Sequence, residues 1–314
     1  IVYDASAKPH NNAPSLNDCL EVGPPLQNLL WNVLARCRMR PVAITGDLKQ
    51  AFLQIRIRDE DRDALRFHWI KDRNSTEIEV LRFTRLVFGL GPSPFVLGGT
   101  IESHLDKEHQ NHPEAVEELR KSLYIDDVIS GDDDTESCSD FKVTIRAIFK
   151  RAGFDLHKWH SNIKELEDDN ISEVEENDST FAKQQLPVKT DTASILGLGW
   201  DKSADELEVK FPELETATTK RGILKYLASI YDPLGITSPV LLLGKLIFRE
   251  ICDLKVGWDT PLPISISNQW RQWKRQLPSC ITIPRAIPGL PMKIDYIDIH
   301  TFGDASKKGL CTAI

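Results

Sequence analysis

Hydrophobic and polar positions in the first part of the chain predict one helix and two strands. Apolar residues recur at helical spacing over residues 24–37, after a pair of prolines, and Pro41 ends this predicted amphipathic helix. The next run, 42–45, is short and mostly apolar, which is typical of a buried strand, and Asp47 lies at its end. A further strand is predicted over 78–86.

Glycine and proline residues at 89–94 predict a turn, and a helix with apolar positions follows over 95–105. A charged helix is predicted over 113–121. The next long helix should cover 139–151 and end near Gly153, because glycine is the usual residue after a helix C-terminus.

Two short β-type runs, 123–125 and 128–130, flank the pair Asp126 and Asp127. This pattern predicts a hairpin with carboxylates at its tip. An acidic pair by itself is typical of a solvated turn. The apolar residues on both sides favour a partly buried site instead.

The rest of the chain is predicted to be strand-like at first and then largely helical. The expected strands and helices are, in order, strands at 156–160 and 195–200, helices at 216–231, 240–252 and 265–276, and an alternating strand at 296–302. Strands carrying carboxylates, backed by helices and followed by a helical part, indicate an α+β domain and a mostly α one.

Composition agrees with a globular protein of two or three packed units, since the 314 residues are 41% hydrophobic and 27% charged. Every apolar run falls short of the about 20 residues that cross a bilayer. The chain does not begin with Met and shows no signal-peptide layout, so we expect a piece of a longer protein. Six scattered cysteines favour reduced thiols and an intracellular setting.

The net charge of −8 argues mildly against a nucleic-acid partner, because phosphate binding usually needs a basic surface. Much of this excess comes from one acidic run over 165–178, which we interpret as a solvated loop or disordered insert. Basic residues recur elsewhere, at Arg36, Arg38, Arg40, Lys220, Arg221 and Lys225. The net charge therefore does not decide the partner.

Asp47, Asp126 and Asp127 raise a common physical problem if they lie together. Clustered carboxylates repel one another, and burial raises their pKa values unless a cation compensates. Two divalent ions about 4 Å apart can do this and can also drive displacement at phosphorus. Ligands that offer only oxygen indicate Mg²⁺ or Mn²⁺ rather than zinc.

The motifs around these aspartates resemble those of reverse transcriptases. YIDD at 124–127 resembles their signature hairpin, and ITGDLKQAF at 44–52 resembles their first catalytic strand. Further segments are similar to the Pol proteins of Bel-Pao retrotransposons, over residues 1 to about 255: SLNDCLEVGPPLQNLL (15–30), FGLGPSPFVLG (88–98), KWHSN (158–162), ILGLGW (195–200) and YDPLGITSP (231–239).

This resemblance implies an α+β right-hand polymerase. Partial fingers and a palm, with an antiparallel sheet and helices, would occupy 1–204; a mostly α thumb and connection would occupy 205–290; the truncated start of a ribonuclease H-like domain would occupy 291–314. The implied activity is RNA- and DNA-directed DNA synthesis, in which nucleotides pass from dNTP to a primer 3′-OH during retrotransposon replication. The alternative is a catalytically impaired fragment that only binds nucleic acid.

The resemblance also assigns roles to single residues. Asp47, Asp126 and Asp127 match the acids that bind two Mg²⁺ or Mn²⁺ ions. Phe52 matches an aromatic ring against the sugar of the incoming nucleotide, although by its neighbours alone it would be a core residue. Phe88 matches a residue beside the incoming nucleotide and the template.

Four further assignments follow from the same resemblance. Gly89 continues the motif of Phe88 beside the nucleotide. Lys158 lies near a lysine thought to protonate pyrophosphate, but a surface lysine would look the same. Residues 196–199 resemble a hairpin that grips the primer end. TFGDAS at 301–306 resembles the first ribonuclease H strand, with Asp304 at its first metal-ligand position.

The expected partners are an RNA template, a DNA primer and product, dNTP, and the other Pol domains (protease, ribonuclease H and integrase), with no membrane. Lys220, Arg221 and Lys225 would follow the duplex backbone, unless they are simply a solvated helix face. The resemblance points to an intracellular, cytoplasmic particle. It also places the basic residues that hold the triphosphate before Ile1, so we expect weak polymerisation by this chain. We expect no ribonuclease H activity, because Asp304 alone cannot assemble a metal pair.

Overall fold

The protein is described by a computed structural model that covers residues 4–71, 77–168, 192–213, 217–290, 298, 300–306 and 310–313. Most of the acidic run at 165–178 and part of the alternating segment at 296–302 lie outside these described residues. The chain divides into two compact units, one of residues 1–33 with 42–184 and one of residues 34–41 with 185–314.

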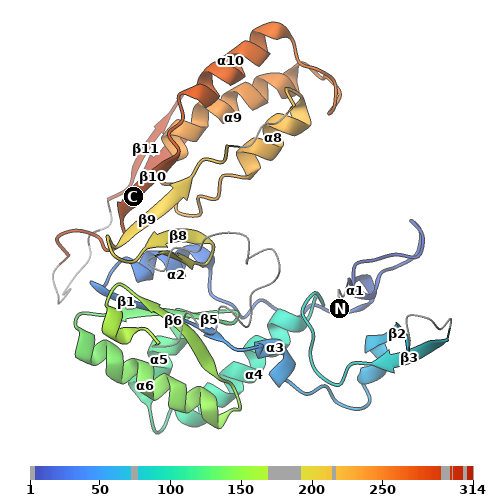
Figure 1. Cartoon of the computed structure of the whole chain (residues 1–314), viewed down its shortest axis with the longest axis vertical. Helices are drawn as coiled ribbons and strands as arrows, with labels where there is room; N and C mark the ends of the chain where they lie inside the picture. Colours follow the sequence, from blue (N-terminus) through green and yellow to red (C-terminus); the bar gives the residue numbers. More distant parts are fainter. Residues whose placement is uncertain are drawn as a thin grey trace. The chain divides into compact units, whose positions relative to one another are not determined.

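A four-stranded antiparallel sheet organises the first unit, with strand order β4-β5-β1-β6. Three helices cover one face of this sheet (Figure 1). The strands are β1 (Val42–Leu48), β4 (Leu123–Tyr124), β5 (Asp127–Asp132) and β6 (Leu156–Ser161), and the helices are α4 (Ser93–Glu108), α5 (Pro113–Ser122) and α6 (Thr135–Arg151).

Local sequence signals fix the ends of these helices. Proline lies in the first turn of both α4 and α5, where its missing N–H costs nothing. The Asp134 side chain caps α6 by accepting a hydrogen bond from the Ser137 backbone N–H at 2.8 Å. After α6 the chain turns at Gly153, whose φ of +81° favours glycine. The apolar faces of the three helices then pack with β1 in one buried core.

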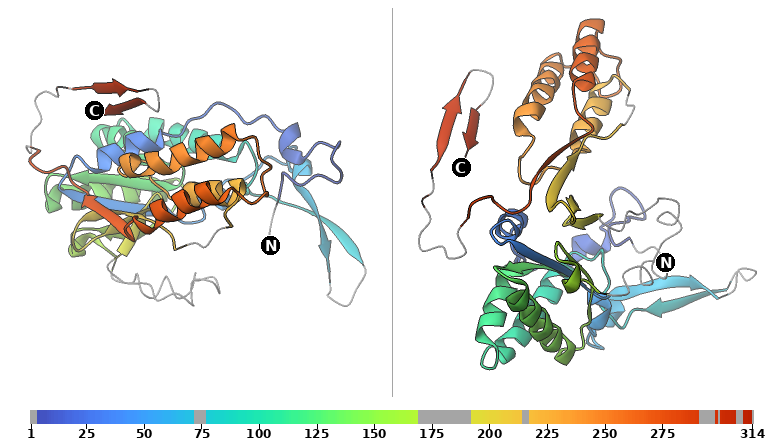
Figure 2. Two further views of the ribbon diagram at one scale, coloured as in Figure 1. Left: turned by 90° about the horizontal axis from the view of Figure 1, so that it is seen from above. Right: turned by 60° about the vertical axis from the view of Figure 1, so that its left-hand side comes forward.

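Several short helices and a two-stranded antiparallel ribbon, formed by β2 and β3, precede α4 in the chain (Figure 2). These are α1 (Leu16–Cys19), α2 (Leu30–Cys37), α3 (Ala51–Gln54), the 3₁₀ helix η1 (Arg62–Leu65), β2 (Arg66–Ile70) and β3 (Ile78–Arg82). The division between the units falls within α2. The strand predicted over 78–86 ends at Arg82, and β2 was not predicted.

The helix predicted over 24–37 starts later than expected, since α2 begins at Leu30. The prolines disfavour a helical conformation at residues 23 and 24, which precede them, and the non-helical segment continues to residue 29. The non-helical segment is also held by its own contacts. Asn28 Nδ2 donates to the Arg120 carbonyl at 2.7 Å and to the Leu123 carbonyl at 2.8 Å, and so satisfies acceptors at the end of α5.

The second unit combines another antiparallel sheet, of order β10-β9-β8-β7, with three helices and a terminal hairpin. Its elements are β7 (Thr192–Ile195), β8 (Leu198–Asp201), β9 (Glu206–Lys210), α8 (Lys220–Ala228), α9 (Ser238–Asp253), α10 (Ile264–Arg275), β10 (Cys280–Pro284), β11 (Phe302–Ala305) and β12 (Leu310–Ala313). The β8–β9 hairpin spans residue 204, which the sequence suggested as a domain boundary. Neither β9 nor β10 was predicted.

Aromatic rings join the three helices of the second unit. The Tyr226 ring of α8 contacts the Trp270 ring of α10 edge-on, with centroids 5.6 Å apart. Gly244 lets α9 approach α10 closely, because a Cβ at this position would lie 2.6 Å from the Trp273 ring. Within the part of the chain that the structure describes, no helix is both long and apolar enough to span a membrane.

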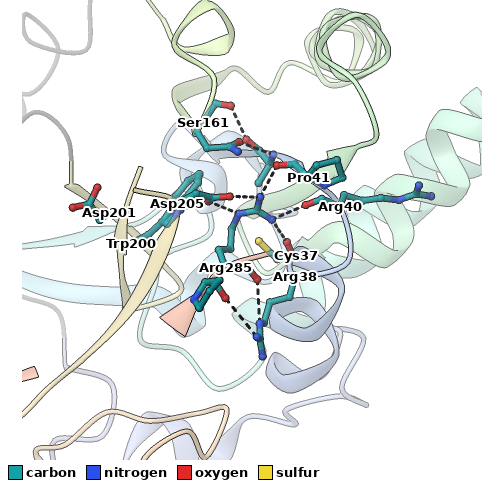
Figure 3. A network of polar contacts seen from close by, with 12 residues as sticks. Cys37, Arg38, Arg40, Pro41, Ser161, Trp200, Asp201, Asp205 and Arg285 are labelled. Atoms are coloured by element: carbon teal, nitrogen blue, oxygen red, sulfur yellow. Dashed lines mark hydrogen bonds and ion pairs between the residues drawn. The ribbon is translucent and has the colours of Figure 1, made fainter. Parts of the chain in front are cut away.

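A buried arginine ties the two sequence segments of the second unit together (Figure 3). Arg285, which is 0% exposed, binds both carboxylate oxygens of Asp205 at 2.7 Å. It also donates to the backbone carbonyls of Cys37, Arg40 and Pro41 at 2.6–2.8 Å. Residues 34–41 therefore belong to this unit through specific contacts.

Candidate active site

The structure brings the three predicted aspartates together in the first unit. β1 pairs with β5 so that the Cα atoms of Asp47 and Asp127 are directly opposite. Tyr124 pairs with Asp127, which leaves Ile125 and Asp126 as the turn between β4 and β5. The Asp126 carbonyl accepts a hydrogen bond from the Leu48 N–H at 2.8 Å, so the turn is fastened to the central strand.

The turn that carries Asp126 is strained. Ile125 has a φ of +58°, in the left-handed region that β-branched residues rarely adopt. This conformation costs roughly 1–2 kcal/mol for an L-residue. Packing offsets the cost, because Ile125 contacts the helix-side core of the sheet. Backbone strain of this kind clusters at functional sites.

Burial and mutual repulsion dominate the electrostatics of the cluster. Burial raises the pKa of Asp126, and the neighbouring charge of Asp47 raises it further. For Asp127, burial is again the main cause, followed by repulsion from Asp126 and Asp47, and its pKa rises to about 7. These carboxylates therefore lack a compensating positive charge in the protein alone, as the sequence argument anticipated.

A histidine that the sequence analysis did not single out also belongs to this cluster. His157 of β6 is the Cα partner of Asp47 on the other side of β1. Its Nε2 atom lies 2.8 Å from Asp47 Oδ2. An available signal was its place directly before the KWHSN motif, but the local pattern does not show which strand face it occupies.

The side chains around the three aspartates bear on the predicted metal ions. Among the described residues, no group of three or more His, Cys, Asp or Glu side chains is arranged as a ready-made metal site. Mg²⁺, however, is usually held by one or two carboxylates together with water and substrate phosphates, without a closed protein cage. Two buried carboxylates that repel each other, Asp126 and Asp127, together with Asp47, fit such an ion in charge and in ligand chemistry. The identity and number of the ions stay predictions.

The predicted nucleotide-side residues are positioned as follows. Phe52 lies in α3 and packs partly against the helix-side core of the first unit. Phe88 is 62% exposed. Gly89 has a φ of +88°, which a glycine adopts readily, and its carbonyl accepts a hydrogen bond from Asn17 Nδ2 at 3.0 Å. Their contacts with a nucleotide stay predictions.

The other residues assigned by resemblance lie on β6, in the β7–β8 turn and on β11. Lys158 lies on β6 with a φ of +53°, and its role with pyrophosphate stays a prediction. Leu196 and Gly197 form the two-residue turn of the β7–β8 hairpin, and the Leu196 carbonyl accepts from the Tyr231 hydroxyl at 2.8 Å. The backbone of Asp304 lies in β11, opposite Cys311 of β12.

Two of the three lysine and arginine residues predicted to follow a duplex lie around an exposed aromatic ring. Lys220 Nζ is 4.9 Å from the ring centre of Trp258, which is 47% exposed. Arg221 stacks nearby and forms a two-pronged ion pair with Asp259, at 2.7 and 3.0 Å. The charge of Arg221 is thus partly neutralised by Asp259. Of these two residues, Lys220 is therefore the better candidate to contact a phosphate.

Comparison with known families defines one part of the chain. Residues 219–314 match the family model described as the Pao retrotransposon-like RNaseH-like domain. This supports the prediction that the chain is a region of a Bel-Pao Pol polyprotein. The matched domain includes most of the predicted thumb and connection (205–290) and all of the predicted ribonuclease H-like segment (291–314). It covers just under a third of the chain and does not reach the three aspartates. A search among curated proteins gave no match.

Proposed function

We propose that the first unit is the polymerase core of a Bel-Pao reverse transcriptase, an RNA- and DNA-directed DNA polymerase. The observation that carries this proposal is the convergence of Asp47 on β1, Asp127 on the neighbouring β5 and Asp126 in the turn that precedes β5. The retrotransposon domain matched at residues 219–314 supports it independently, because it lies on the same chain.

In this proposal each side chain of the site has a separate role at the primer end. Asp47 and Asp126 hold the cations by their carboxylates, and Asp127 adds negative charge beside them. Two bound Mg²⁺ or Mn²⁺ ions supply activation of the primer 3′-hydroxyl and stabilisation of the leaving oxygen. Phe52 limits the space at the sugar. The helices behind the sheet keep the carboxylate-bearing strands rigid, which positions the reacting groups.

Nucleic acid and other Pol domains are the partners that the retrotransposon match suggests. In the second unit, Lys220 and the exposed Trp258 ring offer a charge and a flat surface, the two features that contact phosphates and bases. We propose the first turn of α8, together with Trp258 from the segment after α9, as a contact for the template–primer duplex or its single-stranded end.

Primer extension by Asp126→Asn is the direct test. With RNA and DNA templates and Mg²⁺, this variant should lose DNA synthesis by a factor on the order of 10² or more, because charge stabilisation in the transition state is lost. Its template–primer affinity, measured by fluorescence anisotropy, should stay near the wild-type value. Asp140→Asn is the matched control, since it removes one exposed aspartate from α6.

The two functions considered give different results in this assay. Synthesis by wild-type protein that Asp126→Asn abolishes supports the polymerase. Binding of template–primer without any extension by the wild type supports a fragment that only binds nucleic acid. Equal extension by wild type and Asp126→Asn contradicts the assignment of the three aspartates.

A further inference from the structure

The side chains of His157 and Trp159 lie on opposite faces of the sheet, although residues two apart in a regular strand lie on the same face. Ile44 and Thr45 of β1 pair with Ser161 and His160, whereas Asp47 pairs with His157. β6 therefore contains one more residue than β1 over this stretch, which is a β-bulge opposite Gly46.

The bulge has a structural cause on each strand. Lys158 takes a φ of +53°, the left-handed conformation found at the first residue of one common bulge type. Trp159 is fully buried beneath the sheet, and a Cβ at Gly46 would come within 3.1 Å of its ring. Glycine at position 46 thus leaves room for the indole.

This extra residue decides which side chains share a face. Side chains alternate along a strand, so without the bulge His157 and Trp159 would lie on the same face. With it, Trp159 enters the helix-side core, while His157 lies on the face of Asp47. The bulge thereby brings the imidazole to the aspartate without exposing the indole.

The contact between His157 and Asp47 is directional. An ionised carboxylate only accepts hydrogen bonds, so Nε2 must carry the hydrogen in the 2.8 Å contact with Asp47 Oδ2. Asp47 Oδ1 has no hydrogen-bond partner among the described residues. The His157 side chain is 14% exposed, so its orientation is restricted by packing.

We propose that His157 is a positioning residue for the metal site. It holds one oxygen of Asp47 so that the other oxygen faces the cation, which rests on the proposed function of Asp47 as a metal ligand. A hydrogen bond from outside the ligand set fixes a carboxylate in this way in many metalloproteins, and its removal typically costs 10–100-fold in metal affinity or activity.

Three variants test this proposal through Mg²⁺ binding. His157→Leu removes the donor, His157→Gln keeps an N–H on a side chain of similar reach, and His160→Leu removes the other histidine on the same face of β6. Each EDTA-treated protein is titrated with Mg²⁺ while its melting temperature is followed. The measured quantity is the Mg²⁺ midpoint, the concentration at which half of the total increase in melting temperature is reached. His157→Leu should need about 10–100 times more Mg²⁺ than wild type; His157→Gln should stay within several-fold, and His160→Leu should match wild type.

Primer extension separates a local role from general damage. The His157→Leu rate should fall at an Mg²⁺ concentration that saturates the wild type, and it should recover as Mg²⁺ is raised. A folded His157→Leu variant with the wild-type Mg²⁺ midpoint overturns the positioning role, even if the wild type is a polymerase. Mg²⁺ binding that depends on His157, in a wild type that never extends primers, instead overturns the proposed function.

Histidine nitrogen NMR provides a second measurement if His157→Leu does not fold. In ¹⁵N-histidine-labelled, metal-free wild type, the His157 signal is assigned by its absence in His157→Gln. A proton on Nε2 supports the proposal. A bare Nε2 with the proton only on Nδ1 overturns it, since that tautomer cannot donate to Asp47.

Discussion

The ring of Phe52 lies five residues after Asp47 and is only partly buried against the core of the first unit. One part of this side chain therefore contributes to packing, while another part is accessible. Both interpretations of the sequence, a core residue and a residue against the nucleotide sugar, are compatible with this position. The two make different predictions for a smaller side chain.

Phe52→Val should relax discrimination against ribonucleotides while DNA synthesis from dNTP persists, because the smaller side chain admits a 2′-hydroxyl. The measurement is the ratio of kcat/KM for dNTP and rNTP in primer extension. Phe141→Val is the control, since Phe141 is also partly buried against the same core but lies on α6. If Phe52 acts only in packing, its replacement lowers stability by about 1–3 kcal/mol and leaves the sugar preference unchanged.

At the same scale, the sequence predicted part of the candidate site. Asp47, Asp126 and Asp127 could be named because a run of apolar residues next to carboxylates is unusual and local in sequence. His157 could not, because its approach to Asp47 depends on one extra residue in β6, and a bulge changes the face of every side chain beyond it.

Among the elements, α4 and α6 are joined at their ends by an ion pair. Arg151 donates to both carboxylate oxygens of Glu108, at 3.0 and 2.6 Å. The hydrogen bonds from Arg151 lower the pKa of Glu108 below its usual value, although burial opposes this. The pairing therefore stabilises the fold when Glu108 is ionised.

Glu108→Gln should lower the melting temperature at pH 7 but not in acid. The unfolded chain has the ordinary glutamate pKa of about 4.3, and the folded pKa is lower, so the stabilisation is present above pH 4.3 and disappears as the pH falls through the folded value. Arg151 is 45% exposed, so we expect about 0.5–1 kcal/mol at pH 7.

Thermal unfolding between pH 3 and pH 7 measures this effect. Glu21→Gln, at an exposed position outside the helices, is the matched control and should follow the wild type throughout. A difference between Glu108→Gln and wild type that stays constant with pH would show that packing, rather than the ionised pair, is responsible.

The helices were predicted more completely than the strands. The helices α4, α5 and α6 were predicted from apolar spacing and from proline or glycine near their ends, which are local signals, although α6 begins at Thr135 instead of 139. The strand β9 alternates Leu207 and Val209 with Glu and Lys residues, which are poor strand formers, and its strand form depends on pairing with β8 and β10. Such pairing is not visible in a five-residue pattern.

At the scale of the molecule, Arg285 is a single residue on which the second unit depends. It has no exposed surface, and its contacts join Asp205 to three backbone carbonyls of residues 37–41. Burial also raises the pKa of the adjacent Cys37 thiol to about 11, so that this cysteine stays protonated and unreactive at neutral pH.

Arg285→Met should destabilise the protein by roughly 3–5 kcal/mol, because it leaves the Asp205 carboxylate and the carbonyls without their donor. The urea midpoint of unfolding, followed by tryptophan fluorescence, measures this loss. Arg275→Met, at the exposed end of α10, should change it little. Adding Asp205→Asn to Arg285→Met removes the buried charge, keeps an oxygen that accepts from Trp200 Nε1 and tolerates the φ of +54° at this position, so part of the stability should be recovered. No recovery would mean that the carbonyl contacts, not the charge pair, dominate.

The contacts of Arg285 also determine the order in which the two units can fold during protein synthesis. Arg285 and Cys37 are 248 positions apart, so the carbonyls of residues 37–41 are made long before their donor leaves the ribosome. During this interval the aspartate-bearing strand β1, which begins at Val42, has already been synthesised together with β4, β5 and β6. The first unit can therefore fold on the nascent chain, whereas the second must wait for its last strands and closes a very long loop when they arrive.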